Sequence, residues 1–427
     1  MQRLLRTRRF VILCFLIHSF IASSTYSRQP SDSLDVLQQS APKVFIDCGY
    51  CDENFLRTEI TFVNYVRDPK QADVHVLLTD QQTGGRGTEF TLTFIGQNAY
   101  KGMNDTLAFI TQQSDTDDIK RRSLARMLKI GLLRYAAKTP MLSRLSVNYD
   151  KPAKQAAAVD KWDYWVFRIS MNSYLNGQKS QSFTSLYGNL SANRVTNDWK
   201  INLSLYANYN ESNFTIDDAE ISSVSRGQGF NGSIVRSLDD HWSAGGYVSS
   251  WSSTYSNIRL QTSAAPAVEY NLFPYSESTR RQLRFLYKAG IRSSQYNEET
   301  IYEKLTELLF GESLSATLEL RQTWGTMEIS IEGSHYFHDL SKRRLVIFGN
   351  LSLRIFEGLS LNLYGDYSRI HDQLSLPKAG ASAQEVLLQR TQLATNYSYY
   401  TSIGLSYTFG AIFNNIVNPR FGGSGGF

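Results

Sequence analysis

The alternation of apolar and polar residues from about residue 162 onward is the strongest pattern in the chain. In the segment 198–209, apolar side chains recur at Ile201, Leu203 and Leu205, with Asn202 and Ser204 between them. The segments 311–323 and 359–371 alternate in the same way. A period of two is typical of a β-strand that has one apolar face. The C-terminal part of the chain is therefore predicted to be a β-sheet.

Twelve such segments can be delimited. They lie near 163–175, 182–194, 199–209, 222–236, 241–252, 258–273, 281–293, 311–323, 326–336, 344–355, 359–370 and 396–409. Short turns alternate with longer connections at 210–220, 293–307, 337–343 and 371–394. A soluble sandwich would also alternate along its strands, but the alternation of turn lengths favours a membrane barrel. We expect a mainly β protein with an antiparallel transmembrane β-barrel of about twelve strands over 162–410.

The region 44–138 has a mixed pattern. Strand-like runs occupy 44–47, 60–66, 72–78, 89–95 and 106–110, and a short helix fits 52–59. Thr116 with two following acids is a helix N-cap signal, and Leu124, Leu128 and Leu132 then repeat every four residues until Pro140. These elements predict a small α/β sandwich domain. Residues 28–43 are interpreted as a flexible leader and residues 139–161 as a linker.

The first residues have the features of an export signal. Four arginines (Arg3, Arg6, Arg8, Arg9) precede an apolar run over 10–22, which is shorter than the ~20 residues that span a membrane. Residues 1–27 are therefore predicted to be a signal peptide rather than a retained anchor. Without them the formal charge of +5 falls to +1, so charge gives no reason to expect nucleic acid. A mean hydropathy of −0.32 with 13% aromatic residues fits a barrel better than a helical membrane protein.

The last predicted strand contains Ser402, Gly404, Tyr407 and Phe409 at a spacing that resembles the C-terminal β-signal of outer-membrane proteins. That signal is read by the barrel-insertion machinery and normally ends the chain, whereas here residues 411–427 follow as a tail. The chain as a whole resembles Gram-negative outer-membrane β-barrel proteins that carry a small N-terminal periplasmic α/β domain. The resemblance implies insertion among outer-membrane lipid, with the domain and the C-terminal tail in the periplasm.

Two cysteines of the predicted domain are separated by two residues. In an oxidising compartment Cys48 and Cys51 are expected to form a local structural disulfide. The alternative is a redox motif resembling that of the thioredoxin class. That class needs a proline loop facing the disulfide, and Pro69 alone lies between Cys51 and Pro140. The glycine-rich run 84–87 joins two predicted strands, so it is interpreted as a hairpin turn rather than a phosphate loop.

Charged residues recur on the polar side of the predicted strands. Alternation places ten of them in the lumen: Arg168, Glu269, Arg284, Lys288, Glu319, Arg321, Glu328, Glu332, Arg354 and Asp366. They are either a charged solute pathway or a ladder of cross-strand salt bridges, and their mixed signs favour the ladder. We expect Arg284 and Lys288 to face Glu319, and Arg321 to face Glu328 or Glu332. Arg354 is expected between the strands of Glu332 and Asp366, and the lumen to be largely closed.

These patterns contain no catalytic constellation, and they predict neither a cofactor nor a bound metal. The leading hypothesis is a structural or assembly component whose periplasmic domain docks another, unidentified periplasmic or envelope protein. A small-solute outer-membrane channel is the first alternative. A periplasmic thiol-disulfide redox enzyme is the second.

Overall fold

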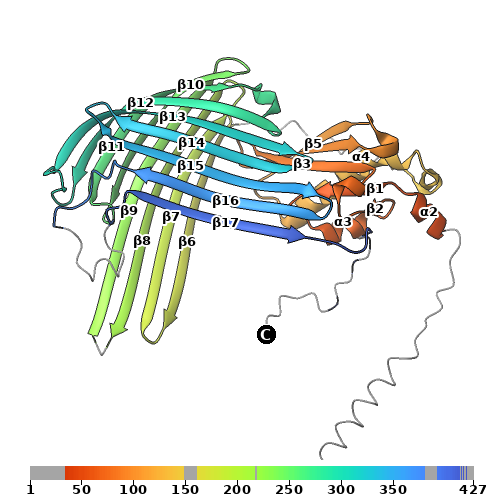
Figure 1. Cartoon of the computed structure of the whole chain (residues 1–427), viewed down its shortest axis with the longest axis horizontal. Helices are drawn as coiled ribbons and strands as arrows, with labels where there is room; N and C mark the ends of the chain where they lie inside the picture. Colours follow the sequence, from red (N-terminus) through yellow and green to blue (C-terminus); the bar gives the residue numbers. More distant parts are fainter. Residues whose placement is uncertain are drawn as a thin grey trace, which may run out of the picture.

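The structure is a computed structural model that describes residues 34–148, 161–216, 219–379, 392–413, 415, 417 and 420. The chain forms a five-stranded sheet with helices and a separate twelve-stranded sheet (Figure 1). The predicted signal peptide lies outside the described residues. Within the described part of the chain, no helix is long and apolar enough to cross a membrane.

The small sheet has the order β2-β1-β3-β4-β5, in which β1 is parallel to β2 and β3 and the rest is antiparallel. Its elements are α2 (Leu34–Ser40), β1 (Lys43–Asp47), α3 (Glu53–Glu59), β2 (Asn64–Tyr65), η1 (Pro69–Gln71), β3 (Val74–Gln82), β4 (Thr88–Gly96), η2 (Asn98–Tyr100), β5 (Asp105–Thr111), α4 (Asp117–Ala136) and η3 (Pro140–Arg144). The helix α2 corrects part of the predicted flexible leader. The strand predicted over 60–66 is only two residues long, because its chain turns to join η1.

The helix α4 covers one face of this sheet. Its N-cap Thr116 accepts a hydrogen bond from the backbone N–H of Ile119, as the sequence signal indicated. Leu128 and Leu132 are buried against Phe94 of β4 in a single apolar core. Gly131 faces the Phe94 ring so closely that a Cβ atom there would overlap it. The missing side chain therefore sets how closely the helix approaches the sheet.

The large sheet is an antiparallel meander in which each strand pairs with its neighbours in sequence. Its strands are β6 (Trp165–Gln178), β7 (Gln181–Val195), β8 (Trp199–Ile216), β9 (Ala219–Ser237), β10 (Trp242–Ser253), β11 (Ile258–Asn271), β12 (Arg281–Tyr296), β13 (Thr306–Gln322), β14 (Gly325–Tyr336), β15 (Asp339–Phe356), β16 (Leu359–Ile370) and β17 (Tyr397–Tyr407). The twelve antiparallel strands are confirmed. Two expected connections are wrong: the described residues of the long one at 210–220 and of the moderate one at 337–343 belong mostly to strands, because polar alternation continues there beyond the apolar part of each strand.

The expected closure of this sheet is not seen. β6 and β17 are its two edges, and the described residues contain no pairing between them. Side chains on both edges are exposed, with Ile169 at 83% and Ile403 at 72%. In Figure 1 the long strands β6–β9 run at a steep angle to β14–β17. Strand twist accumulates across a sheet, so the two edges diverge.

The α/β domain lies at the end of the large sheet that carries the turns 196–198, 323–324 and 357–358 (Figure 1). We call this the domain end and the opposite one the far end. One face of the small sheet packs on α3 and α4. Residues of its other face, including Asp47, contact strands of the large sheet. The small sheet is therefore held between its own helices and the domain end.

Candidate functional site

The strand register places all ten predicted lumen charges on one face of the large sheet. One continuous row runs from Arg284 through Thr317, Ser330 and Phe348 to Asp366. Alternation along each strand and the pairing of the remaining strands bring the others to the same face. The α/β domain makes its ion pairs with this face, which we call the inner face.

Only part of the expected salt-bridge ladder is present within the sheet. Arg284 pairs with Glu319 on the neighbouring strand, as expected. Lys288 lies 3.9 Å from Glu332, two strands away, rather than next to Glu319. Both pairs are about a third exposed, so each contributes under about 1 kcal/mol. These two ion pairs do not form the continuous salt-bridge ladder that was expected to close the lumen.

The expected partners of Arg321 and Arg354 are wrong. Arg321 pairs with Asp80 of the α/β domain at 3.4 Å, rather than with Glu328 or Glu332. Arg354 binds Asp47 of the domain and does not reach Asp366. Both arginines lie near the last residues of their strands at the domain end. Their side chains therefore meet the small sheet instead of a neighbouring strand.

Arg354 makes several contacts where the α/β domain meets the domain end of the large sheet, and the main one is with Asp47. The guanidinium donates to both carboxylate oxygens, at 2.7 and 2.5 Å, and also to the carbonyl of Thr323. It also lies 5.3 Å from the centre of the Phe45 ring. A bidentate pair of hydrogen bonds fixes the relative orientation of the two side chains as well as their distance. This residue therefore aligns β1 with β15.

Asp47 also contacts a histidine from the next strand of the small sheet. The Nε2 atom of the fully buried His75 lies 3.0 Å from the second carboxylate oxygen. Burial alone would raise the pKa of Asp47, but the hydrogen bonds from His75 and Arg354 and the charge of Arg354 lower the pKa below its ordinary value. The carboxylate is thus held ionised between a buried ring and a guanidinium.

The turn between β3 and β4 makes a second connection. Here the glycine-rich run 84–87 is a hairpin turn, as predicted, and Arg86 donates to the hydroxyl of Ser191 on β7 at 2.8 Å. Gly84 approaches Val195 so closely that a Cβ atom would overlap its side chain. The sequence identified the turn but gave no sign that it docks on the large sheet.

A third connection joins the turn β15–β16 to the domain. The backbone N–H of Gly358 donates to Asp68 at 2.6 Å. Gly358 has a φ of +77°, which a residue with a Cβ atom adopts at a cost. This turn therefore presents its N–H to Asp68 because glycine stands there.

The C-terminal tail reaches the same domain. After β17 the chain runs beside β2, where Phe413 forms a β-bridge with Val66. The side chain of Asn415 accepts from the backbone N–H of Tyr65 at 2.6 Å and donates to Asn64 at 2.8 Å. The edge of the small sheet at β2 is thus covered by the tail.

The residues that resemble a β-signal lie on and just after β17. Ser402 and Gly404 lie opposite Tyr364 and Asn362 on the inner face, and Tyr407 lies opposite Leu359. Phe409 stacks on Tyr407 with ring centres 5.6 Å apart. The two aromatic residues are exposed at the edge of the sheet.

Cys48 and Cys51 form a disulfide between β1 and α3. The N-cap of α3 is Asp52, so both cysteines precede the helix. A helix N-terminus that lowers a thiol pKa would need the first cysteine at that cap. The predicted local disulfide is thus present, and both of its cysteines lie before the first residue of the helix. Among the residues that the structure describes, His, Cys, Asp and Glu form no group of three that could hold a metal ion.

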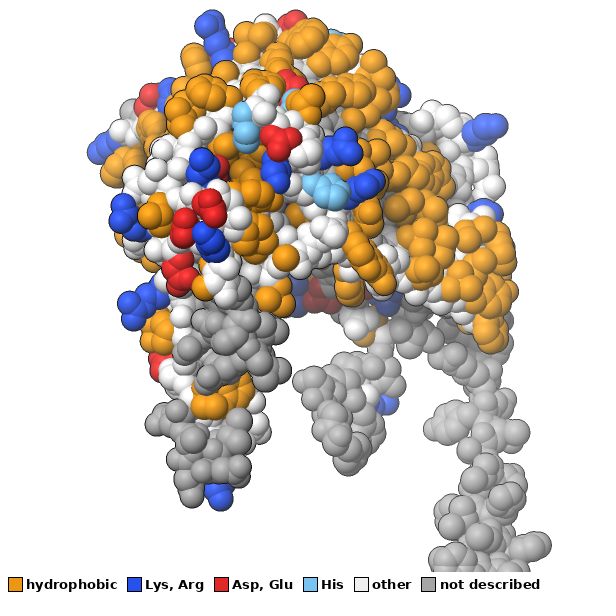
Figure 2. All heavy atoms as spheres, turned by 60° about the vertical axis from the view of Figure 1, so that its left-hand side comes forward, with side chains coloured by type: hydrophobic (Ala, Val, Ile, Leu, Met, Phe, Trp, Pro, Cys, Tyr) orange, Lys and Arg blue, Asp and Glu red, His pale blue; other side chains and the backbone are white. Residues whose placement is uncertain are grey.

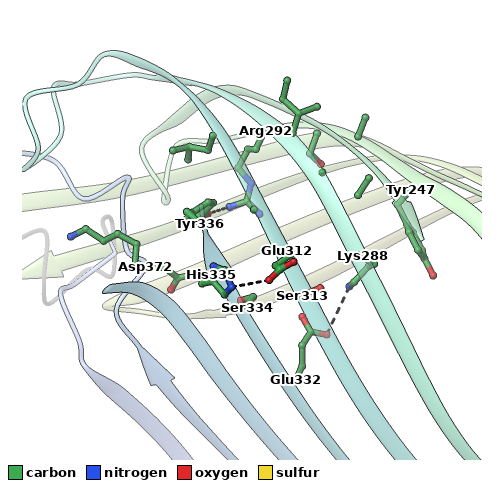
Figure 3. A pocket seen from close by; sticks show the side chains of 18 residues that line it. Tyr247, Lys288, Arg292, Glu312, Ser313, Glu332, Ser334, His335, Tyr336 and Asp372 are labelled. Atoms are coloured by element: carbon green, nitrogen blue, oxygen red, sulfur yellow. Dashed lines mark hydrogen bonds and ion pairs between the residues drawn. The ribbon is translucent and has the colours of Figure 1, made fainter. Parts of the chain in front are cut away.

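A cavity of about 340 Å³ lies among the strands β10–β14 (Figure 3). Its charged and aromatic lining includes Lys288 with Glu332, and Arg292, which donates to the hydroxyl of Tyr336. Positively and negatively charged side chains thus line the cavity. It could hold water or a small polar solute.

No known protein family matches the chain, and no curated relative does. Among solved structures, the translocator domain of the autotransporter NalP from Neisseria meningitidis is similar to it, with 10% sequence identity and a TM-score of 0.19. The match covers 57% of this chain and 81% of that one. A similarity of this degree supports no conclusion about function.

Proposed function

We propose that this protein is an outer-membrane barrel that serves as a structural or assembly component and holds its α/β domain at the periplasmic mouth for another envelope protein. The outer face of the large sheet supports the membrane location. Large apolar side chains remain exposed there, among them Leu314 (54%), Ile331 (46%) and Ile347 (37%). The inner face of the same strands is mainly polar and charged, with Val346 and Phe348 of β15 as apolar exceptions. This is the division that a lipid environment requires of a barrel.

The observation that carries the anchoring role is the junction itself. Asp47 with Arg354, Asp80 with Arg321, and Asp68 with Gly358 connect the small sheet to three places at the domain end. The tail additionally covers the β2 edge. A simple channel needs no domain fixed against its mouth, whereas a scaffold does.

The surface left for a partner is the helix layer and the β5 edge. On α4, Ile119 and Ile130 are about half exposed, and their spacing of eleven residues puts them on one side of the helix. On β5, Ile110 is 60% exposed at the other edge of the small sheet. Apolar side chains of this kind are typical of a contact with another protein.

The proposal can be tested with a photoreactive amino acid placed at Ile119 and Ile130 in intact cells. We expect each position to give the same discrete adduct with an envelope protein. The matched control carries the probe at Ile403, which is exposed on the apolar side of β17. If the α4 positions gave no protein adduct while the barrel assembled normally, the docking role would be wrong.

A small-solute channel is the second candidate, and the cavity among β10–β14 favours it. If the protein is a channel, the α/β domain would regulate the entry of solutes at the mouth of the pore. Planar-bilayer recording separates the two, because a scaffold should show no steady conductance. A steady conductance that persists in the unaltered protein would favour the channel.

A redox enzyme is the least supported of the three functions. The Cys48–Cys51 bridge precedes the α3 cap. The sequence also lacks a proline loop suited to face the bridge. We therefore keep the non-enzymatic interpretation.

A further inference from the structure

The outer face of β14, β15 and β16 carries a continuous apolar stripe. Alternate residues form it on each strand: Met327, Ile329 and Ile331 on β14; Leu345, Ile347, Leu351 and Leu353 on β15; and Leu359, Leu361, Leu363 and Tyr367 on β16. On β15 the stripe extends over eight residue steps, or about 26 Å at ~3.3 Å per residue. That length agrees with the roughly 25 Å apolar band of outer-membrane barrels.

The stripe ends on all three strands at basic residues. His335 on β14 lies opposite Arg343 on β15, and the backbone N–H of His371 donates to the carbonyl of Arg343 at 3.0 Å. Arg369 on β16 lies opposite Leu345, the last residue of the stripe on β15. Its Nε atom donates a hydrogen bond to Nε2 of His371 at 3.2 Å. Cross-strand neighbours have Cβ atoms about 5 Å apart. We call these four residues the basic patch.

The two arginines of the patch carry positive charge that is not neutralised by an ion pair within the described residues. Glu312 is paired with His335 at 2.9 Å (Figure 3). Within the described part of the chain, neither Arg343 nor Arg369 forms an ion pair, and both side chains are exposed. Asp372, the next acid along the chain, pairs instead with Arg344. Figure 2, which brings the far end forward, shows His, Lys and Arg side chains beside hydrophobic ones, with Asp and Glu side chains among them.

We propose that the basic patch binds the phosphate of a lipid headgroup in the leaflet around the far end. This inference rests on the proposed membrane location. Two guanidinium groups bind phosphate through paired, charge-assisted hydrogen bonds. The patch borders the apolar stripe directly, so the acyl chains of the same lipid would lie along Leu345 and Ile347. That continuity favours a lipid over a soluble anion.

The test uses the full chain folded in detergent micelles that contain diphosphoryl or monophosphoryl lipid A, two lipids that differ by one phosphate. Retained lipid is counted by native mass spectrometry. We expect the unaltered protein to retain the diphosphoryl lipid preferentially. The variant R343Q/R369Q should bind it about 25-fold more weakly, since each arginine near an anionic headgroup is worth about fivefold. Inorganic phosphate at millimolar concentration should compete little.

Matched controls separate this site from general charge and from folding. R226Q/R259Q removes two exposed arginines at the far end that lie on other strands, and it should leave retention unchanged. R343K/R369K keeps the charge and should restore part of the binding. Heat-modifiable migration of each sample reports whether the barrel has folded. A folded, heat-modifiable protein that shows no preference between the two lipids would overturn this inference alone, whereas a chain that gives no heat-modifiable barrel in the micelles would overturn the proposed function.

Discussion

Replacing Arg354 with Gln should loosen the α/β domain from the large sheet. The change removes both hydrogen bonds to Asp47 and leaves that carboxylate beside the buried ring of His75. The side chains of Arg354 and Asp47 are 28% and 16% exposed, so the pair is screened only in part. Hydrogen bonds to charged groups contribute about 1.5–3 kcal/mol. We take about 2 kcal/mol for the loss, which is about a 30-fold shift in the docking equilibrium.

Hydrogen exchange of the folded protein in detergent measures this shift. Peptides that cover β1 and β3 should exchange faster in R354Q, whereas peptides from β10 should not change. A double-mutant cycle with D47N should give a coupling energy above about 1.5 kcal/mol, because each substitution removes the same contact. The variant R226Q serves as the control. If protection of β1 changed by less than about 0.5 kcal/mol, the ion pair would not hold the domain.

The same contact predicts a pH dependence. The pKa of Asp47 is lowered in the docked state, so its contribution is fully present above the ordinary pKa of 3.8. The contribution is lost as the pH falls through the lowered value, because the carboxyl group then becomes protonated. Exchange protection of β1 should therefore decrease only in acid. In D47N this acid-dependent part should be absent.

Three further predictions concern other parts of the chain. Replacing both Tyr407 and Phe409 with Ala should leave unassembled, protease-sensitive protein if they act as a β-signal; normal amounts of heat-modifiable barrel would contradict this. The Cys48–Cys51 bridge should not catalyse disulfide exchange. Reduction of insulin by the full chain in detergent would show a redox function instead. Gly358→Ala should destabilise the protein by about 1–3 kcal/mol, since φ is +77° and a Cβ atom would overlap the backbone of Thr408. Gly333→Ala, where a Cβ atom would meet nothing within 4 Å, is its control, and equal melting temperatures would refute the argument.

Local pattern determined the elements of this protein. A period of two located all twelve strands of the large sheet, because one face of each strand is apolar and the other polar. The N-cap at Thr116 and the leucines that follow located α4. The spacing of Cys48 and Cys51 permitted a local bridge whatever the rest of the fold. Each of these signals acts between residues that are close in sequence.

Only the tertiary structure decided which distant residues the ends of those elements contact. Alternation places Arg321 and Arg354 on the inner face, but their partners Asp80 and Asp47 lie 241 and 307 residues away. That pairing depends on which face of the small sheet meets the domain end, and no local period encodes it. The docking of Phe413 beside β2 and the divergence of β6 from β17 are of the same kind. They follow from strand stagger and accumulated twist, which are properties of the whole sheet rather than of any one strand.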